Sequence, residues 1–175
     1  MLDEISPVQF IEGVNEYAEP LEDQGINTRG YSGVAIEYLP KLSYTLKKLD
    51  IFLKHKEPPH EGKCKVALCT SDPKGNPSDI VLSEGGFAWK QTLGDWQQVE
   101  LEPIVVRPSN KYWLTIDLDG GYIVLPIAKE GDESALRFRG KERWRTHDLF
   151  KANKVMLRFY GRVLPVPSQH SRKEH

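Results

Sequence analysis

The sequence predicts an all-β protein: an antiparallel two-sheet β-sandwich, jelly-roll-like, with a short N-terminal helical or irregular arm. Three observations support this fold class. Short runs with period-two alternation recur, turn residues separate them, and a single segment has a helical pattern. The clearest run spans residues 112–118, whose alternate side chains face opposite sides of a strand: Tyr112, Leu114, Ile116 and Leu118 against Trp113, Thr115 and Asp117.

The N-terminal arm, residues 1–33, differs from the rest. Ser6 and Pro7 are typical of a helix start. Apolar residues then fall on one helical stripe: Phe10, Ile11, Val14 and Tyr17. We expect a short amphipathic helix that packs on the edge of the sandwich or docks on a partner. The sandwich domain is expected over residues 34–166, and a flexible polar tail over 167–175.

Later strands alternate in the same way and predict the core. The expected core residues share one face of their strands: Leu49, Ile51, Leu53, Val66, Leu68, Val99, Leu101, Leu114, Ile116, Leu157 and Phe159. Cys64 and Cys69 are an odd number of residues apart, so they lie on opposite faces of one strand. We therefore expect two buried thiols and no disulfide.

Composition limits the partners. The chain has 175 residues, a length that suits one domain. Its 24 Lys and Arg nearly balance its 25 Asp and Glu, so no net positive charge favours binding to nucleic acid. No apolar run is long enough to insert into a membrane, and the N-terminus lacks a signal-peptide pattern. The sequence as given therefore predicts a cytoplasmic protein, or an extracellular one if the chain is a domain excised from a longer protein.

Catalysis is not expected. None of the five histidines lies in a metal-binding spacing or near a nucleophile motif, and no glycine-rich loop suits a phosphate, so no cofactor is predicted. Residues 117–121, DLDGG, suggest a calcium site but lack its further acidic ligands. A solvated hairpin end is the favoured interpretation, and no metal site is assigned.

The central stretch carries a family resemblance. A W-x-x-V-x-L strand (Trp96, Val99, Leu101) precedes a Y-W-L strand (Tyr112, Trp113, Leu114), and this order resembles the carbohydrate-binding-module-like jelly rolls over residues 43–118. The resemblance implies a β-sandwich module of the kind appended to larger surface or secreted proteins. The matched positions are packing positions, so no ligand-binding residue is transferred from the family.

The outward face of the strands is the predicted binding surface. Because side chains alternate along a strand, we expect Trp113 to point away from the core, as do Phe52, Tyr160 and Arg158. Aromatic rings beside charged groups suit the recognition of a sugar. The alternative is that the chain's own loops or the N-terminal helix cover these rings. Trp144 is placed at the rim between Arg143 and Arg145, a composition typical of recognition sites, although it is equally suited to capping one end of the sandwich.

These observations favour a non-catalytic binding module with a glycan as its ligand. The alternative is a structural or assembly module that binds other protein chains. If a ligand covers Trp113, the substitution Trp113→Ala is expected to abolish binding and to lower the free energy of unfolding by no more than about 1 kcal/mol.

Overall fold

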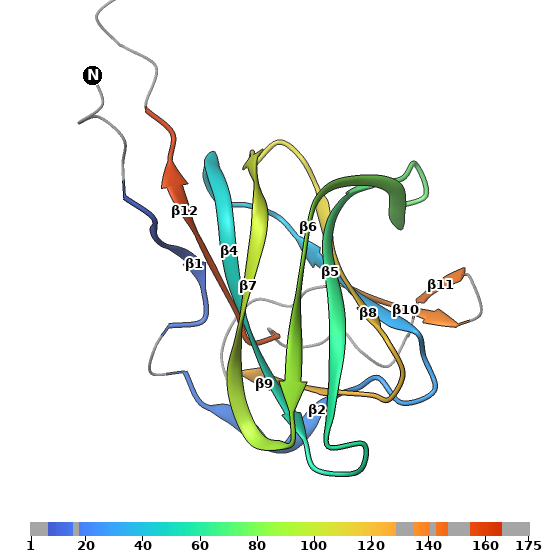
Figure 1. Ribbon diagram of the computed structural model, residues 1–175. Coiled ribbons are helices and arrows are strands. Elements are labelled where there is room, and N and C mark those ends of the chain that lie inside the picture. Colours follow the sequence, from blue (N-terminus) through green and yellow to red (C-terminus); the bar gives the residue numbers. More distant parts are fainter. Residues whose placement is uncertain (1–6, 16–17, 129–134, 141–142, 147–154, 166–175) are drawn as a thin grey trace, which may run out of the picture.

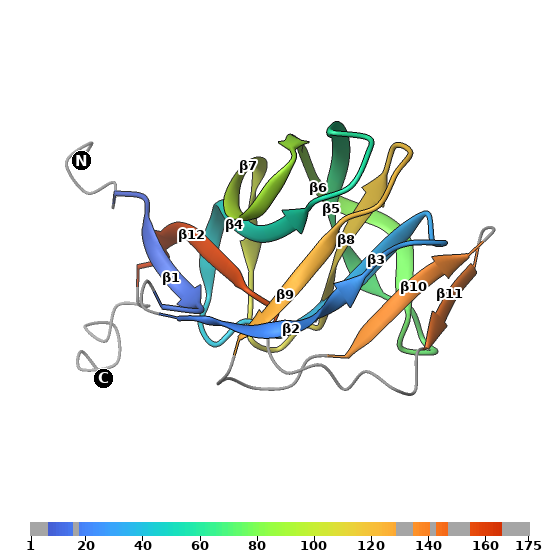
Figure 2. The ribbon, with the colours of Figure 1, turned by 90° about the horizontal axis from the view of Figure 1, so that it is seen from below.

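The computed structural model describes residues 7–15, 18–128, 135–140, 143–146 and 155–165. These residues form two antiparallel sheets and no helix, which confirms the predicted all-β, two-sheet sandwich. Figures 1 and 2 show β1 and β12 on one side of the molecule and β10 and β11 on the other.

The first sheet has the strand order β1-β12-β4-β9-β2, and β7 also pairs with β4. The bounds of its strands, in that order, are β1 (Gln9–Gly13), β12 (Leu157–Val163), β4 (Tyr44–His55), β9 (Val124–Ala128), β2 (Pro20–Asn27) and β7 (Thr92–Val106).

The second sheet has the order β11-β10-β3-β8-β5-β6. Its strands, in that order, are β11 (Arg143–Thr146), β10 (Leu136–Gly140), β3 (Gly33–Tyr38), β8 (Tyr112–Leu118), β5 (Glu61–Ser71) and β6 (Pro77–Lys90). The chain passes from this sheet to the first one between β6 and β7. Within these two strands, Gly85 of β6 lies against the backbone of Glu100 of β7, where an added Cβ would come within 2.1 Å of the carbonyl oxygen. Only glycine allows so close an approach.

The core lies between the two sheets. All eleven residues that the alternation assigned to the core are buried, so the predicted parity of these strands is confirmed. The two cysteines are buried free thiols on opposite faces of β5: Cys64 belongs to the core cluster, and Cys69 lies opposite Trp113 of the neighbouring strand β8. Burial raises the pKa of the Cys64 thiol to about 12, because the apolar surroundings disfavour the thiolate.

The expected N-terminal helix is wrong. Residues Gln9–Gly13 form β1, which pairs with β12, and Pro20–Asn27 form β2, which pairs with β9. Ile11 packs against the core while Phe10 is turned outward, so this segment follows period two and not the helical stripe. Without β1, one edge of β12 would have unpaired backbone groups. The hydrogen bonds that β1 forms there stabilise the strand more than the local helix propensity favours a helix. Tyr17 and the tail over 167–175 lie outside the described residues.

Candidate functional site

The predicted binding residues do not share one face. Trp113 lies on β8 of the second sheet, whereas Arg158 and Tyr160 lie on β12 of the first sheet. The outer faces of two packed sheets point away from each other, so the single surface expected from the sequence is wrong. The alternation of side chains shows which face of its own strand a residue occupies, but it does not show which strands belong to the same sheet.

Trp113 is turned away from the core as expected, yet its ring is covered. Its exposed fraction is 0%. Lys111 Nζ and the guanidinium of Arg137 lie 5.0 and 5.1 Å from the ring centroid, and the indole N–H donates to Ser71 Oγ at 3.3 Å. Arg137 is itself held by Asn76, whose Oδ1 accepts a hydrogen bond from Nε at 2.8 Å. The expected exposure of Trp113 is therefore wrong.

Trp144 lies on β11, at the edge of the second sheet, and is half-buried. The Arg139 guanidinium lies 4.6 Å from its ring centroid, and Nη1 of Arg139 also pairs with Asp117 at 3.3 Å. Trp144 thus makes an ordinary packing contact within the sheet. The side chains of Arg143 and Arg145 lie outside what the structure describes.

The outer face of the first sheet carries the other two predicted residues. Arg158 lies 3.9 Å from the ring centroid of Trp96 and donates to the carbonyl oxygens of Val14 and Asn15. Tyr160 stacks edge-on against Phe10 at 5.9 Å. Burial raises the pKa of the Tyr160 hydroxyl. The chain's own side chains thus contact both residues.

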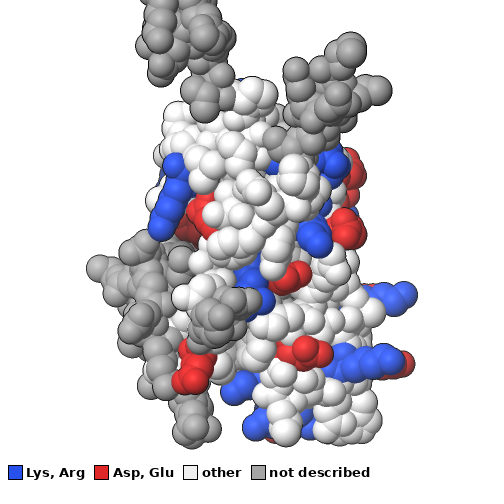
Figure 3. Space-filling view, turned by 90° about the vertical axis from the view of Figure 1, so that its left-hand side faces the viewer, with Lys and Arg blue, Asp and Glu red and all other residues white. Residues whose placement is uncertain are grey.

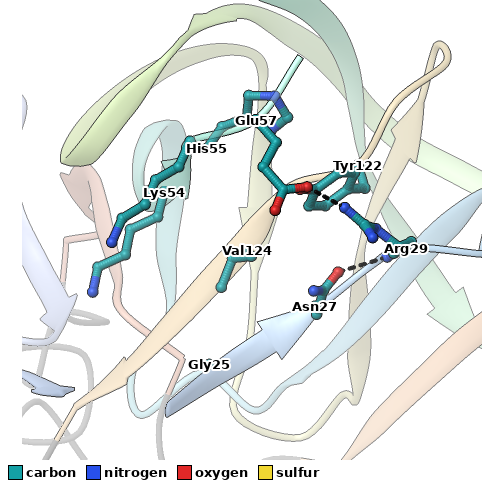
Figure 4. A pocket seen from close by; sticks show the side chains of 9 residues that line it. Gly25, Asn27, Arg29, Lys54, His55, Glu57, Tyr122 and Val124 are labelled. Atoms are coloured by element: carbon teal, nitrogen blue, oxygen red, sulfur yellow. Dashed lines mark hydrogen bonds and ion pairs between the residues drawn. The ribbon is translucent and has the colours of Figure 1, made fainter. Parts of the chain in front are cut away.

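A pocket of about 390 Å³ lies on the first sheet, at the end of β4 (Figure 4). We call it the Arg29 pocket. Nine residues line it: Gly25, Asn27, Arg29, Lys54, His55, Lys56, Glu57, Tyr122 and Val124. They come from β2, β4 and β9 and from the loops that adjoin these strands.

Three neighbouring strands form the floor of the pocket. Val124 of β9 pairs with Lys54 of β4 on one side and with Asn27 of β2 on the other. Next to this row, an added Cβ on Gly25 would come within 2.8 Å of a methyl carbon of Val124. Glycine at this position lets β2 lie close to β9, so Arg29, which follows β2, and Tyr122, which precedes β9, lie close together over the floor.

Arg29, Glu57 and Tyr122 contact one another at one end of the Arg29 pocket. The Tyr122 hydroxyl donates to Glu57 Oε2 at 2.7 Å, and Arg29 forms an ion pair with the same oxygen. The Arg29 guanidinium also lies 4.3 Å from the Tyr122 ring centroid. The hydrogen bond from Tyr122 and the charge of Arg29 hold the pKa of Glu57 below its ordinary value. This carboxylate therefore stays ionised at neutral pH.

The wall behind this group is aromatic. His55 has an exposed fraction of 1% and lies between Trp89 and Tyr122, with ring centroids 4.1 and 5.1 Å away. Its Nε2 donates to the carbonyl of Pro59, and its Nδ1 has no partner among the described residues. This packing fixes the position of the Tyr122 ring.

The remaining charges of the pocket are basic. Lys54 and Lys56 flank the buried His55 along the chain, so both leave the core side of the sheet. Neither has an ion pair with another described residue. On the side of the molecule that carries β1 and β12, by contrast, basic and acidic side chains are interspersed (Figure 3). No group of three or more potential metal ligands occurs within the described ranges.

Sequence reasoning missed this pocket. Arg29, Glu57 and Tyr122 lie in turn-rich segments without periodicity, and their contacts span 28 and 65 residues of sequence. The one available signal was the density of charged and turn residues in KEPPHEGK, which includes Glu57.

No family model matches this chain, and a comparison with curated proteins finds no significant relative. The structure has no helix long and apolar enough to cross a membrane within the residues it describes.

Proposed function

We propose that this protein is a non-catalytic binding module that holds a glycan in the Arg29 pocket. The observation that carries the proposal is the convergence, in one cavity of about 390 Å³, of an aromatic ring with several polar side chains. Sugars are recognised by this combination, because ring faces pack on C–H groups while amides and charged groups bond the hydroxyls. The resemblance of residues 43–118 to carbohydrate-binding-module-like jelly rolls points the same way.

The polar groups offer both donors and acceptors. Asn27 Oδ1 accepts a hydrogen bond from the backbone N–H of Arg29 at 2.9 Å, which leaves its amide N–H groups to donate to a ligand. Glu57 Oε2 is engaged by Arg29 and Tyr122, whereas its second oxygen is turned toward the side of the pocket where Val124 lies (Figure 4). A sugar hydroxyl placed between Asn27 and Glu57 would be bonded on both sides.

A glycan array followed by calorimetric titration tests this function. Asn27→Ala removes the proposed amide donor, and Glu57→Gln removes the carboxylate charge with little change of shape. Each is expected to weaken binding about tenfold, the equivalent of about 1.4 kcal/mol. Lys74→Ala is the control, because Lys74 lies exposed in the β5–β6 turn. Retention of no glycan, or equal binding by all three variants, would contradict the proposal.

A second candidate function is assembly with other protein chains. The supporting observation is β6, which lies last in the strand order of the second sheet and exposes Ile80 (62%) and Val81 (45%). An edge strand with exposed apolar residues can pair with another strand. Light scattering coupled to size-exclusion chromatography would reveal a dimer that Ile80→Lys dissociates. A monomer at every concentration would exclude self-assembly through β6.

A further inference from the structure

The charges of the Arg29 pocket bear on the class of glycan. Its lining carries three cationic side chains, Arg29, Lys54 and Lys56, and one carboxylate, Glu57. Arg29 and Glu57 neutralise each other in an ion pair, so the two lysines have no compensating carboxylate among the described residues that line the pocket.

Neither lysine forms an ion pair with a described residue of the pocket lining, so both ammonium groups can pair with a ligand. Figure 4 shows the Lys54 side chain away from the Arg29–Glu57 pair, and Lys56 lines the same pocket. Other lysines of the protein do have carboxylate partners: Lys111 pairs with Glu37 at 3.0 Å, and Lys65 with Glu84 at 3.4 Å.

A second, smaller cavity of about 290 Å³ has basic and acidic residues in equal number in its lining. It is bordered by Lys63 and Lys65 and also by Asp117 and Asp119, so each ammonium group there has a carboxylate in the same lining. The lysine end of the Arg29 pocket has no such carboxylate among the residues that line it. An anionic group placed there would be attracted by the ammonium groups of both lysines and would not have to displace a carboxylate of the protein.

We propose that the Arg29 pocket selects acidic glycans, in which a carboxylate or sulfate on one sugar lies between Lys54 and Lys56. The sugar ring lies at the opposite end, against Tyr122, Asn27 and Glu57. This inference rests on the function proposed above and adds the ligand class. Because Lys56 is exposed and Lys54 is half-buried, their attraction for an anionic group is modest and is screened by salt.

The test compares charged and neutral glycans of one size by NMR titration. The probes are galacturonic acid trisaccharide, its neutral galactose counterpart and a sulfated galactose trisaccharide, and the readout is the shift of the Lys54 and Asn27 backbone amides. We expect the charged probes to bind about tenfold tighter than the neutral one at 20 mM salt, and the difference to shrink to about twofold at 500 mM salt. The two charged probes separate a carboxylate preference from a sulfate preference.

Matched variants locate the charge effect. The double variant Lys54→Gln/Lys56→Gln is expected to bind the charged probes no tighter than the neutral one. The control Lys63→Gln/Lys74→Gln removes the same total charge elsewhere and should retain the preference. Neutral and charged probes that bind equally would overturn the acidic-glycan inference but leave the glycan function standing. Binding of none of the probes, together with an empty glycan array, would overturn both.

Discussion

The outer faces of the two sheets differ in how they use their charged side chains. On the second sheet, Arg137 reaches from β10 past the ring of Trp113 to Asn76 in the β5–β6 turn. Beneath it, the outward residues of the central strands are small and buried: Ala35, Thr115 and Ala67. On the first sheet, the end of β4 opens into the Arg29 pocket, where two lysines have no carboxylate partner in the part of the chain that the structure describes.

The difference teaches that an outward position is not an exposed one. Trp113 and Lys54 both leave the core side of their strands, yet a long neighbouring side chain covers Trp113, while Lys54 borders a cavity. Long cationic side chains bury their stems on apolar surface when small residues leave room for them. The second sheet is therefore completed by its own residues, and the pocket of the first sheet is available to a ligand.

The largest effect is expected from removing the covered ring of the second sheet. Trp113→Ala should lower the free energy of unfolding by about 3–5 kcal/mol, as for other buried tryptophans. Trp96→Ala, which truncates a half-buried ring on the first sheet, should cost less. Chemical denaturation of both variants measures the two values. A loss of about 1 kcal/mol or less for Trp113→Ala would contradict the coverage of the Trp113 ring by its neighbours.

A smaller effect is expected from uncovering the same ring. Arg137→Ala removes the guanidinium 5.1 Å from the Trp113 centroid and should cost about 1 kcal/mol, in the range of a cation–π contact. The indole N–H resonance of Trp113 should shift because its surroundings become wetter. Arg107→Ala is the matched control, since the side chain of Arg107 is exposed. Equal stability of both variants would mean that Arg137 does not contribute to covering Trp113.

The smallest effect concerns the ion pair of the first sheet. Tyr122→Phe removes the hydrogen bond that contributes most to the low pKa of Glu57, so this pKa should rise toward its ordinary value. A lowered pKa in the folded state stabilises it above the unfolded pKa, and this contribution disappears as the pH falls through the folded pKa. Wild type and variant should therefore differ slightly at pH 7 and converge in acid. Carbon-detected NMR titration measures the pKa, and an unchanged value would contradict the assigned hydrogen bond.

Local patterns predicted much of the fold. The alternation in residues 112–118 correctly assigned Leu114 and Ile116 to the core, and the odd spacing of Cys64 and Cys69 correctly placed two unpaired thiols on opposite faces. At the N-terminus the same reasoning failed. There the residues fit a helical stripe, but pairing with β12 decided the conformation.

The sequence by itself determined which side of a strand each residue occupies, because side-chain direction alternates within a few residues of backbone. Only the tertiary structure decided which strands share a sheet, because strand order depends on pairings between residues far apart in the chain. For that reason Trp113 and Arg158 lie on opposite faces of the molecule. For the same reason Arg29, Glu57 and Tyr122, drawn from three separate loops, meet in one pocket.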